Sequence, residues 1–470
     1  MTTSGPLDTN VRFTRRRLDW RVSGVLVGIH LSAIGALASC SSDDRVLGSS
    51  VADDADGADD ADDAPDAGAD GGGRPVTRPP DAATSDAGPR PVVCEAPPCA
   101  MSLTTTAYQT SEGFCALLQD GTVACWGSDR HGQLGRGGEG GLFPPPSATP
   151  APVVGLSNVT RLERTCAIDE DGATWCWGTG PYLRDPSAVV TTERTPVKLP
   201  IPPAKRVGVS WNGVSNLAVG CAVVDTGVLC WGTNKNAQVA EIDLDASSSG
   251  ILSPVPHAIP AGAPIEQIAV GDAAFVTRKD GTLLSWGANP PLGRVSSLAP
   301  DPHLNPVALS GVSSISVEQD NACAIAQGIG YCWGRFDSSD PGQEIGPALA
   351  HALPEPVPTP EPIVQIAARP ASTHTLQLFR GCAVGVSGDV YCWGGNAYGQ
   401  AGDGTKDYAV TPVKVAGLPA PTARVSVSPA STCALLTNGK VFCWGDNSEG
   451  QLGTGQRWEP SLIPVEVQLP

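Results

Sequence analysis

Cysteine is the residue type with reactive chemistry that recurs in a regular pattern along this chain. Of the 15 cysteines among 470 residues, most fall in six pairs separated by nine or ten positions, with Trp-Gly directly after each second member. The pairs are Cys115 with Cys125, Cys166 with Cys176, Cys221 with Cys230, Cys323 with Cys332, Cys382 with Cys392, and Cys433 with Cys443. A zinc site would need cysteines spaced as in Cys-x-x-Cys, with histidines nearby, and the pairs have neither feature. Disulfide bonding is the better interpretation.

The residues between the paired cysteines support this interpretation. A three-residue loop ending in glycine, such as 119–121, is centred in the ten-residue pairs, and two-residue turns such as 225–226 are centred in the nine-residue pairs. Hairpins of these lengths place the two cysteines opposite each other on neighbouring strands, within disulfide range. The fourth copy has Phe275 and Ser285 instead, so both partners are missing together. We predict six such disulfides and an oxidising compartment.

Three cysteines lie outside the pairs. Cys94 and Cys99 form a short seventh pair, and Cys40 remains alone. Cys40 ends the run Leu37-Ala38-Ser39-Cys40, which follows an arginine-rich start and an apolar stretch over 22–38. This pattern is typical of a signal peptide, and its end resembles the bacterial lipobox. The alternative is an ordinary cleavage site beside an unrelated cysteine. We predict a lipoprotein signal peptide over 1–39 and lipidation of Cys40, with Ser41 favouring the outer membrane of a bacterial envelope.

Other groups that could perform catalysis do not form a recognisable arrangement. The six histidines are scattered, and neither a Ser-x-x-Lys nor a Gly-x-Ser-x-Gly element is present. Asp-Gly pairs at 120–121, 171–172 and 280–281 could offer carboxylates for glycoside cleavage. Hairpin turns explain both residues of each pair equally well. We therefore predict no catalytic residue, no metal and no cofactor.

The elements that position the cysteines belong to a repeat of about fifty residues. Each copy contains Trp-Gly, at Trp126, Trp177, Trp231, Trp286, Trp333, Trp393 and Trp444. A strand-rich repeat of this length is typical of a β-propeller with one blade per copy. We predict an all-β fold, a seven-bladed β-propeller over 101–470, with these tryptophans as structural core residues.

A run of small residues follows the tryptophan in three copies. It reads Gly-Gln-Leu-Gly or Gly-Gln-Ala-Gly at 132–135, 399–402 and 450–453. Together with the Trp-Gly pairs, these runs resemble the regulator of chromosome condensation repeat family, in its cysteine-flanked, extracytoplasmic bacterial variety. The resemblance covers about 103–470 and implies a seven-bladed propeller. It also implies the guanine-nucleotide exchange activity of eukaryotic members. An exported lipoprotein would meet no GTPase, so its location argues against that activity.

Charge narrows the range of partners. The net charge of −18 speaks against nucleic acid, whose phosphates require Lys and Arg. About half of the excess lies between Asp43 and Asp86, in a stretch with few bulky apolar residues. Such a stretch cannot bury enough surface to offset its ordering entropy. We predict a disordered Asp/Ala/Gly/Pro-rich tether over 40–100 that contains the small Cys94–Cys99 loop.

The predicted function is that of a monomeric binding module tethered at the cell surface or in the periplasm, which recognises an unknown protein or glycan and touches the membrane only through its lipid. Contact is expected on loops of blades two to six, chiefly the long stretches 207–220 and 366–381, and on unrepeated aromatic residues such as Trp458. The candidate contact residues are Tyr182, Trp211, Phe336, Arg369, His374, Phe379 and Arg380. The alternative is a hydrolase or lyase of polysaccharide or peptidoglycan on the same scaffold.

Closure of the ring is a separate expectation. A Pro-Val element lies between consecutive blades, and a further copy, Pro464-Val465, follows the last blade. An unpaired terminal strand would leave an exposed edge. We therefore expect the C-terminal strand to complete the first blade, with Pro91-Val92-Val93 as the competitor for that place.

Overall fold

The computed structural model describes residues 88–106, 111–138, 144–185, 188–212, 217–240, 251–336, 349–369 and 379–470. The predicted signal peptide, Cys40, the tether up to residue 87 and His374 lie outside these described residues. Within the described ranges the regular elements are all β-strands, and no helix has the length and apolar character to cross a membrane.

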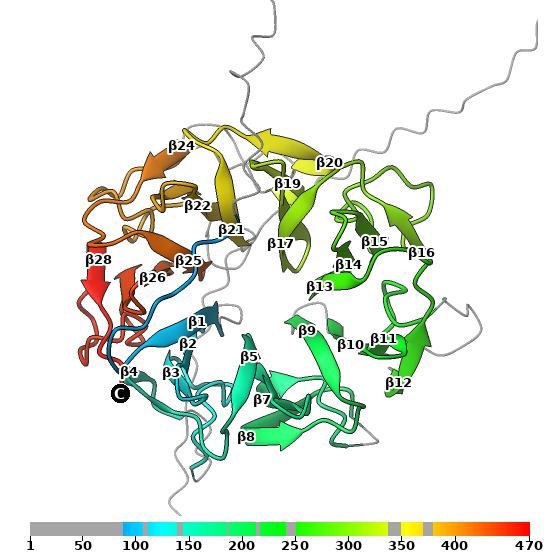
Figure 1. Ribbon diagram of the computed structural model, residues 1–470, viewed down its shortest axis with the longest axis horizontal. Helices are drawn as coiled ribbons and strands as arrows, with labels where there is room; N and C mark the ends of the chain where they lie inside the picture. The colour runs from blue at the N-terminus through cyan, green and yellow to red at the C-terminus, as the bar shows by residue number, and fades with distance from the viewer. Residues whose placement is uncertain are drawn as a thin grey trace, which may run out of the picture. The chain divides into compact units, whose positions relative to one another are not determined.

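The strands form seven antiparallel sheets of four strands each, arranged around a central channel (Figure 1). Each sheet is built from four strands that are consecutive in the chain. The prediction of an all-β, seven-bladed propeller is confirmed.

In every blade the first strand is innermost and the fourth is outermost (Figure 1). The first strands are β1 (Ala100–Thr105), β5 (Val159–Glu163), β9 (Ala204–Asn212), β13 (Ile265–Val270), β17 (Val312–Glu318), β21 (Ile363–Arg369) and β25 (Thr422–Val427). The second strands are β2 (Gly113–Leu118), β6 (Cys166–Asp169), β10 (Leu217–Val224), β14 (Ala273–Arg278), β18 (Asn321–Ala326), β22 (Arg380–Gly385) and β26 (Ser431–Leu436). The third strands are β3 (Val123–Gly127), β7 (Thr174–Gly180), β11 (Gly227–Gly232), β15 (Leu283–Gly287), β19 (Ile329–Phe336), β23 (Val390–Gly394) and β27 (Val441–Gly445). The fourth strands are β4 (Ser147–Pro152), β8 (Thr191–Lys198), β12 (Ile251–His257), β16 (Asp301–Pro306), β20 (Leu349–Val357), β24 (Ala409–Lys414) and β28 (Ser461–Glu466).

The cysteine pairs lie where the hairpin spacing placed them, opposite each other on the second and third strands of their blades. The six opposed pairs are Cys115 and Cys125, Cys166 and Cys176, Cys221 and Cys230, Cys323 and Cys332, Cys382 and Cys392, and Cys433 and Cys443. The sulfur atoms of each pair are at disulfide distance, with Cα atoms 4.0–4.1 Å apart. Cys94 and Cys99 are also at disulfide distance, with Cα atoms 5.8 Å apart.

Blade four replaces its missing pair with two different contacts. Phe275 packs edge-on against Trp333 of the next blade, with ring centroids 5.8 Å apart. Ser285, directly opposite Phe275 in the sheet, accepts a hydrogen bond from Nε of the buried Arg294 at 3.2 Å. Arg294 also forms a 2.8 Å ion pair with Asp301 of β16. An apolar contact and a buried polar cluster thus occupy the place of the covalent link.

The repeated tryptophans join each blade to the one before it. The indole N–H of Trp177 in blade two donates to the carbonyl oxygen of Gln133 in blade one at 2.9 Å. Five further tryptophans donate to a backbone carbonyl of the preceding blade in the same way: Trp126 to Gln451, Trp231 to Pro181, Trp286 to Gln238, Trp333 to Pro291 and Trp444 to Gln400. All seven repeat tryptophans are buried. Their predicted structural role is consistent with this placement.

The ring closes without the strand exchange that we expected, so that expectation is wrong. β28 pairs with β27 of its own blade, with Val465 opposite Cys443. Each Pro-Val element lies in or at the end of the outermost strand of the blade whose Trp-Gly pair precedes it. Seven elements therefore serve seven blades, and none is left over. Blade one takes its own β4, where Pro152 lies opposite Ala124.

Blades seven and one instead meet through side chains and single backbone bonds. The buried Glu112 of blade one accepts hydrogen bonds from the Ser431 hydroxyl and the Ala430 N–H of blade seven, both at 2.7 Å. Burial raises the pKa of Glu112, and these hydrogen bonds oppose that rise. The Ala100 N–H donates to Gly439 at 2.9 Å, and Trp126 reaches Gln451. The Trp126 bond at this seam is the same kind of contact as the tryptophan bonds at five of the other seams.

We predict that non-reducing peptide mapping will recover each of the six blade pairs, and the Cys94–Cys99 pair, as separate linked peptides. Replacing Cys323 and Cys332 together by alanine should lower the free energy of unfolding by roughly 2–3 kcal/mol in oxidising buffer, because the closed loop is short. Once the disulfides of the parent and of the variant are reduced, the two proteins should have the same free energy of unfolding. Free thiols in these blades, or links between blades, would contradict the assignment.

Candidate binding surface

The loops of the propeller divide between two faces of the ring. Because the four strands of each blade alternate in direction, the first-to-second and third-to-fourth loops emerge on one face, which we call the loop face. The second-to-third hairpins and the links between blades emerge on the opposite face. The tips of the two long stretches predicted for contact, 213–216 and 370–378, lie outside the described residues.

The third-to-fourth loop of blade seven shows how the Gly-Gln-Leu-Gly run shapes this face. The Asn447 side chain accepts the Leu452 N–H at 3.1 Å and donates to the carbonyl oxygens of Gln456 and Glu459. The Gln451 side chain accepts the Glu449 N–H at 2.8 Å. These bonds within the loop fix its course, so residues at its rim are held in defined positions.

Trp458, at the end of this loop, is the most exposed aromatic side chain in the described part of the chain, at 70%. Its backbone has a positive φ of 69°, which is unusual for a bulky residue, and its N–H donates to Asn447 at 2.8 Å. The Arg457 guanidinium lies 5.1 Å from the centre of the indole ring and donates to the Ser448 carbonyl at 2.9 Å. The loop thus presents an apolar ring to solvent at a local backbone cost.

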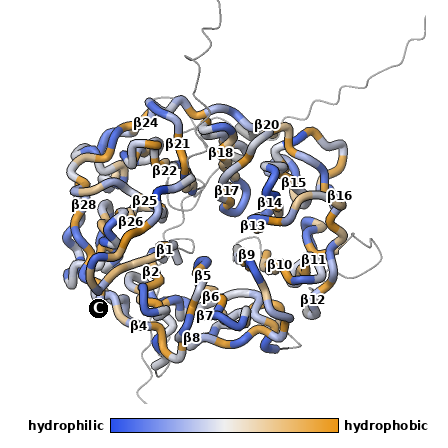
Figure 2. The backbone as a smooth tube through the Cα atoms, viewed as in Figure 1, coloured by the Kyte–Doolittle hydropathy of each residue, from blue (hydrophilic) through white to orange (hydrophobic). Residues whose placement is uncertain are grey.

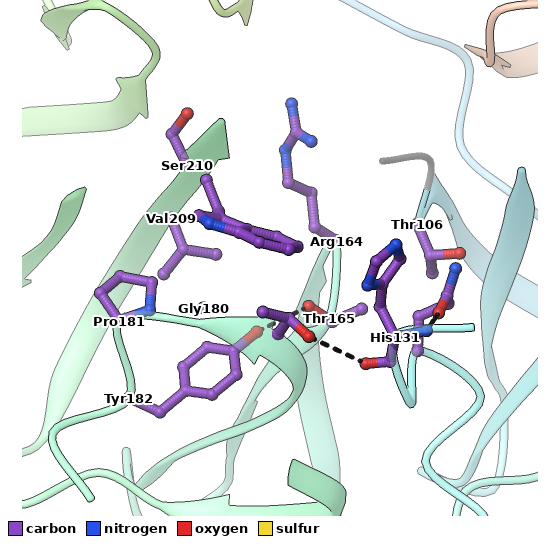
Figure 3. A pocket seen from close by; sticks show the side chains of 12 residues that line it. Thr106, His131, Arg164, Thr165, Gly180, Pro181, Tyr182, Val209 and Ser210 are labelled. Carbon is purple, nitrogen blue, oxygen red and sulfur yellow. Dashed lines mark hydrogen bonds between the residues drawn. The ribbon is translucent and has the colours of Figure 1, made fainter. Parts of the chain in front are cut away.

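Two of the predicted contact residues, Tyr182 and Trp211, line one small pocket on this face (Figure 3). Tyr182 is 1% exposed, and its hydroxyl donates to the Trp177 carbonyl at 2.6 Å. Its ring therefore supports the pocket from below and is not available for partner contact, which corrects the prediction for this residue. Trp211 is half-buried and meets His131 edge-on, with ring centroids 5.4 Å apart.

The pocket has a volume of about 50 Å³. Small-molecule sites usually measure about 300–1,000 Å³, so this hollow suits one side chain of a partner better than a ligand or cofactor. Burial, followed by the neighbouring Arg130, lowers the pKa of His131. His131 is therefore neutral at neutral pH, and sequence reasoning missed it because histidine occupies this loop position in one blade alone.

Arg369 and Arg380 are buried, which corrects their prediction as contact residues. Arg380 donates to the carbonyl oxygens of Ser428, Ser431 and Gln400 at 2.7–2.9 Å, and burial lowers its pKa to about 9. Arg369 forms a 3.2 Å ion pair with Glu318, whose other carboxylate oxygen is bound by Arg164. Sequence reasoning missed Arg164 and Glu318 because they lie far apart in the chain and meet only across the channel.

The remaining candidates are less informative. Phe379 is half-buried and packs against the hydrophobic core between blades five and six. Phe336 ends β19, but its side chain lies outside the described part of the structure, as does the whole of His374. Among the described residues, no group of three or more His, Cys, Asp or Glu side chains is placed to hold a metal ion.

Known repeat models match blades one, six and seven. One model of the regulator of chromosome condensation (RCC1) repeat matches residues 111–133 and 423–451, and another matches 387–435 and 438–470. These blades are similar to RCC1 repeats. The blades that match are those in which the Gly-Gln-Leu/Ala-Gly run is retained.

Two curated proteins illustrate the sequence similarity. The chain is 28% identical to the ultraviolet-B receptor UVR8 of Arabidopsis thaliana over 236 residues, which is 48% of this chain and 50% of that protein. It is 31% identical to the human E3 ubiquitin-protein ligase HERC2 over 137 residues, which is 28% of this chain and 3% of that protein. The chain thus spans half or less of the length of these relatives.

Two solved structures share the fold. Prp20p from Saccharomyces cerevisiae, a protein with binding properties to Gsp1p and histones, has a TM-score of 0.56 at 20% identity over 73% of this chain and 85% of its own. Human WBSCR16 has a TM-score of 0.53 at 18% identity over 74% of this chain and 94% of its own. At these identities the similarity shows the propeller fold alone.

Asp272 on the loop face provides a test of the electrostatics. Its Oδ1 atom is buried without a hydrogen-bond partner, and burial raises its pKa from 3.8 to about 6. The folded state therefore binds the proton more tightly than the unfolded state, and stability should fall as the pH rises from about 4 to about 6. Asp272→Asn should raise the free energy of unfolding by about 3 kcal/mol at pH 8 and leave it nearly unchanged at pH 4.

The matched control is Asp120→Asn in the hairpin of blade one. Hydrogen bonds from the Thr122 side chain and N–H lower the pKa of the exposed Asp120, so this variant should be slightly less stable at pH 8. Urea unfolding of both variants across this pH range checks the prediction. Equal stability of Asp272→Asn and the parent at pH 8 would contradict it.

Proposed function

We propose that this chain is a binding module that recognises a protein partner through the loop face, and that a lipid on Cys40 anchors it to a bacterial envelope. The observation that carries the proposal is Trp458. A large apolar ring is exposed at the rim of a loop whose backbone is fixed by Asn447, and it stacks with the charged Arg457. Tryptophan and arginine are the residue types that dominate the energetics of protein interfaces.

Further aromatic exposure on the same face supports protein recognition. Tyr398, in the third-to-fourth loop of blade six, is 44% exposed, and its N–H is held by the Gln400 side chain at 2.8 Å. Tyr398 and Trp458 stand on corresponding loops of adjacent blades, and both rings are presented by fixed backbones. Pre-organised aromatic residues of this kind lose little conformational entropy on binding.

The relatives support the same class of function. UVR8 is a receptor, and Prp20p has binding properties to Gsp1p and histones. For the alternative, a hydrolase or lyase, carboxylates free to act as acid and base would be needed near the channel. Glu318 has both oxygens bound by arginine, which favours a structural role for it. Binding is therefore the function that the geometry supports best.

Trp458→Ala should weaken partner capture without unfolding the ring. Hot-spot tryptophans contribute about 2 kcal/mol or more, so we expect binding to weaken at least about 30-fold. The full-length protein, fitted with a photo-crosslinker beside Trp458, would be incubated with bacterial envelope fractions and its crosslinked partner identified by mass spectrometry. Purified peptidoglycan sacculi in parallel would reveal a glycan ligand instead.

The control is Ile329→Ala, which removes an exposed apolar side chain from a hairpin on the opposite face. It should retain every crosslink of the parent. If Trp458→Ala also retains them, the loop face of blade seven is not the contact site. Release of soluble fragments from the sacculi would favour the enzymatic alternative.

Lipid anchoring makes a separate prediction. Expressed with its own N-terminus in a Gram-negative host, the chain should incorporate labelled palmitate and sediment with membranes. Cys40→Ser should lose the label and become soluble, whereas Ser39→Ala, beside it, should behave as the parent. Labelling that survives Cys40→Ser would rule out the lipobox interpretation.

A further inference from the structure

The central channel is a second cavity, distinct from the loop face. It has a volume of about 760 Å³ and is lined by the innermost strands of all seven blades. Figure 2 shows hydrophilic residues on parts of these strands, including β5 and β9. A cavity of this size falls within the range of ligand sites.

The third residue of each innermost strand lines the channel, and together these seven residues form one layer around it. In every blade the register of this strand shifts beside that residue, at a bulge or irregularity, and its side chain lines the cavity. The seven residues are Ser102, Arg161, Arg206, Gln267, Ser314, Gln365 and Arg424. Bulges commonly re-aim side chains at functional sites.

The two glutamines at this level have structural partners. Gln365 donates to the Val425 carbonyl of the next blade at 3.2 Å and accepts the Val425 N–H at 2.9 Å. Gln267 bridges to the innermost strand of blade five in the same manner. Their role is to join neighbouring blades, and each amide is held against the adjacent innermost strand.

The three arginines are arranged differently. Arg161 makes no hydrogen bond or ion pair with any described residue, and the Nε of Arg424 is buried without a partner. Arg206 makes a 3.4 Å ion pair with the part-exposed Glu266 and a hydrogen bond to the Lys205 carbonyl. They come from blades two, seven and three, so they lie on the part of the ring centred on blades one and two.

The acidic groups near these arginines do not neutralise them. Glu163 lies one layer deeper in β5, and its pKa is raised by burial and lowered in part by Arg424. Three guanidinium groups therefore face two carboxylates, Glu163 and Glu266, so this end of the cavity is positive in a chain whose net charge is −18. A positive cavity in an acidic protein attracts anions from solution.

The other end of the channel is crossed by charged side chains. Glu318 of blade five binds Arg164 of blade two and Arg369 of blade six, and all three lie at or just beyond the loop-face ends of their innermost strands. Because this ion-paired group joins opposite sides of the ring, entry is easier from the opposite face. That is the end at which Arg161, Arg206 and Arg424 stand.

We propose that this end of the channel binds a multivalent oxyanion, a ligand that carries two or more carboxylate or phosphate groups. Guanidinium groups bind both kinds of oxyanion through two parallel hydrogen bonds. Arg161 and the Nε of Arg424 supply donors that no described residue uses, and Arg206 can exchange its exposed partner Glu266 for the ligand. The site is independent of the loop face and of the proposed protein recognition there.

Calorimetric titration of the full-length protein with two probes, tripolyphosphate and tetraglutamate, tests this site. We expect the parent to bind at least one probe with micromolar affinity at low salt, and the affinity to fall steeply as salt rises. The double variant Arg161→Gln/Arg424→Gln should weaken binding at least tenfold. Since neither side chain makes a hydrogen bond or ion pair with a described residue, the variant should fold and melt close to the temperature of the parent.

The control is Arg130→Gln/Arg457→Gln, which removes the same charge from the loop face and should leave probe binding unchanged. Preference for one probe identifies the oxyanion as phosphate or carboxylate. Failure of the parent to bind either probe, or equal binding by the channel variant, would overturn the proposal. Crosslinking through the loop face should survive in the channel variant, so the two sites can fail separately.

Discussion

The hydrogen bond from a repeat tryptophan to a carbonyl of the preceding blade is the interaction on which the ring depends, and six of the seven tryptophans make it to described residues. The donor is a buried indole N–H, which would be left unsatisfied without this bond. The bond therefore restricts how the two blades can lie against each other. The glycine that ends the Gly-Gln-Leu/Ala-Gly run lies against the same indole. A Cβ at Gly402, for example, would come within 2.5 Å of Trp444. Recurrence of the run within the chain therefore follows from packing between blades rather than from chemistry.

The disulfides link strands within a blade and do not link one blade to another. Each of the six blade disulfides lies inside the central hairpin of one blade, so it stiffens the unit that carries the tryptophan but does not tie units together. Blade four shows that the ring tolerates loss of the covalent bond when Arg294, Ser285 and Asp301 form a polar cluster in the same place. Asp301 accepts so many hydrogen bonds that its pKa lies below the usual range despite burial.

Sequence reasoning reached the fold because the Trp-Gly period and the cysteine spacing are local patterns. It placed the Pro-Val elements in the wrong blade, since an element between two repeats can belong to either, and pairing of Val465 with Cys443 decides the matter. Tyr182 was predicted as a contact residue because it is an unrepeated aromatic residue, and Arg380 because it lies in the long stretch 366–381, yet polar atoms of both are bonded inside the protein. The channel arginines and Glu318 could not be found from spacing, because strands from distant repeats bring them together.

The seam between blades seven and one contains no exchanged strand, and this has a consequence for how such a chain can change. Every blade is one continuous segment, so the first and last strands of the propeller, β1 and β28, belong to two complete blades that meet at this seam. Circular permutation at any junction would preserve all strand pairings. Whole blades could likewise be duplicated or replaced by recombination at these boundaries, with each new blade required only to supply its own indole and a carbonyl for its neighbour. The blade is therefore a unit of evolutionary change as well as a unit of structure.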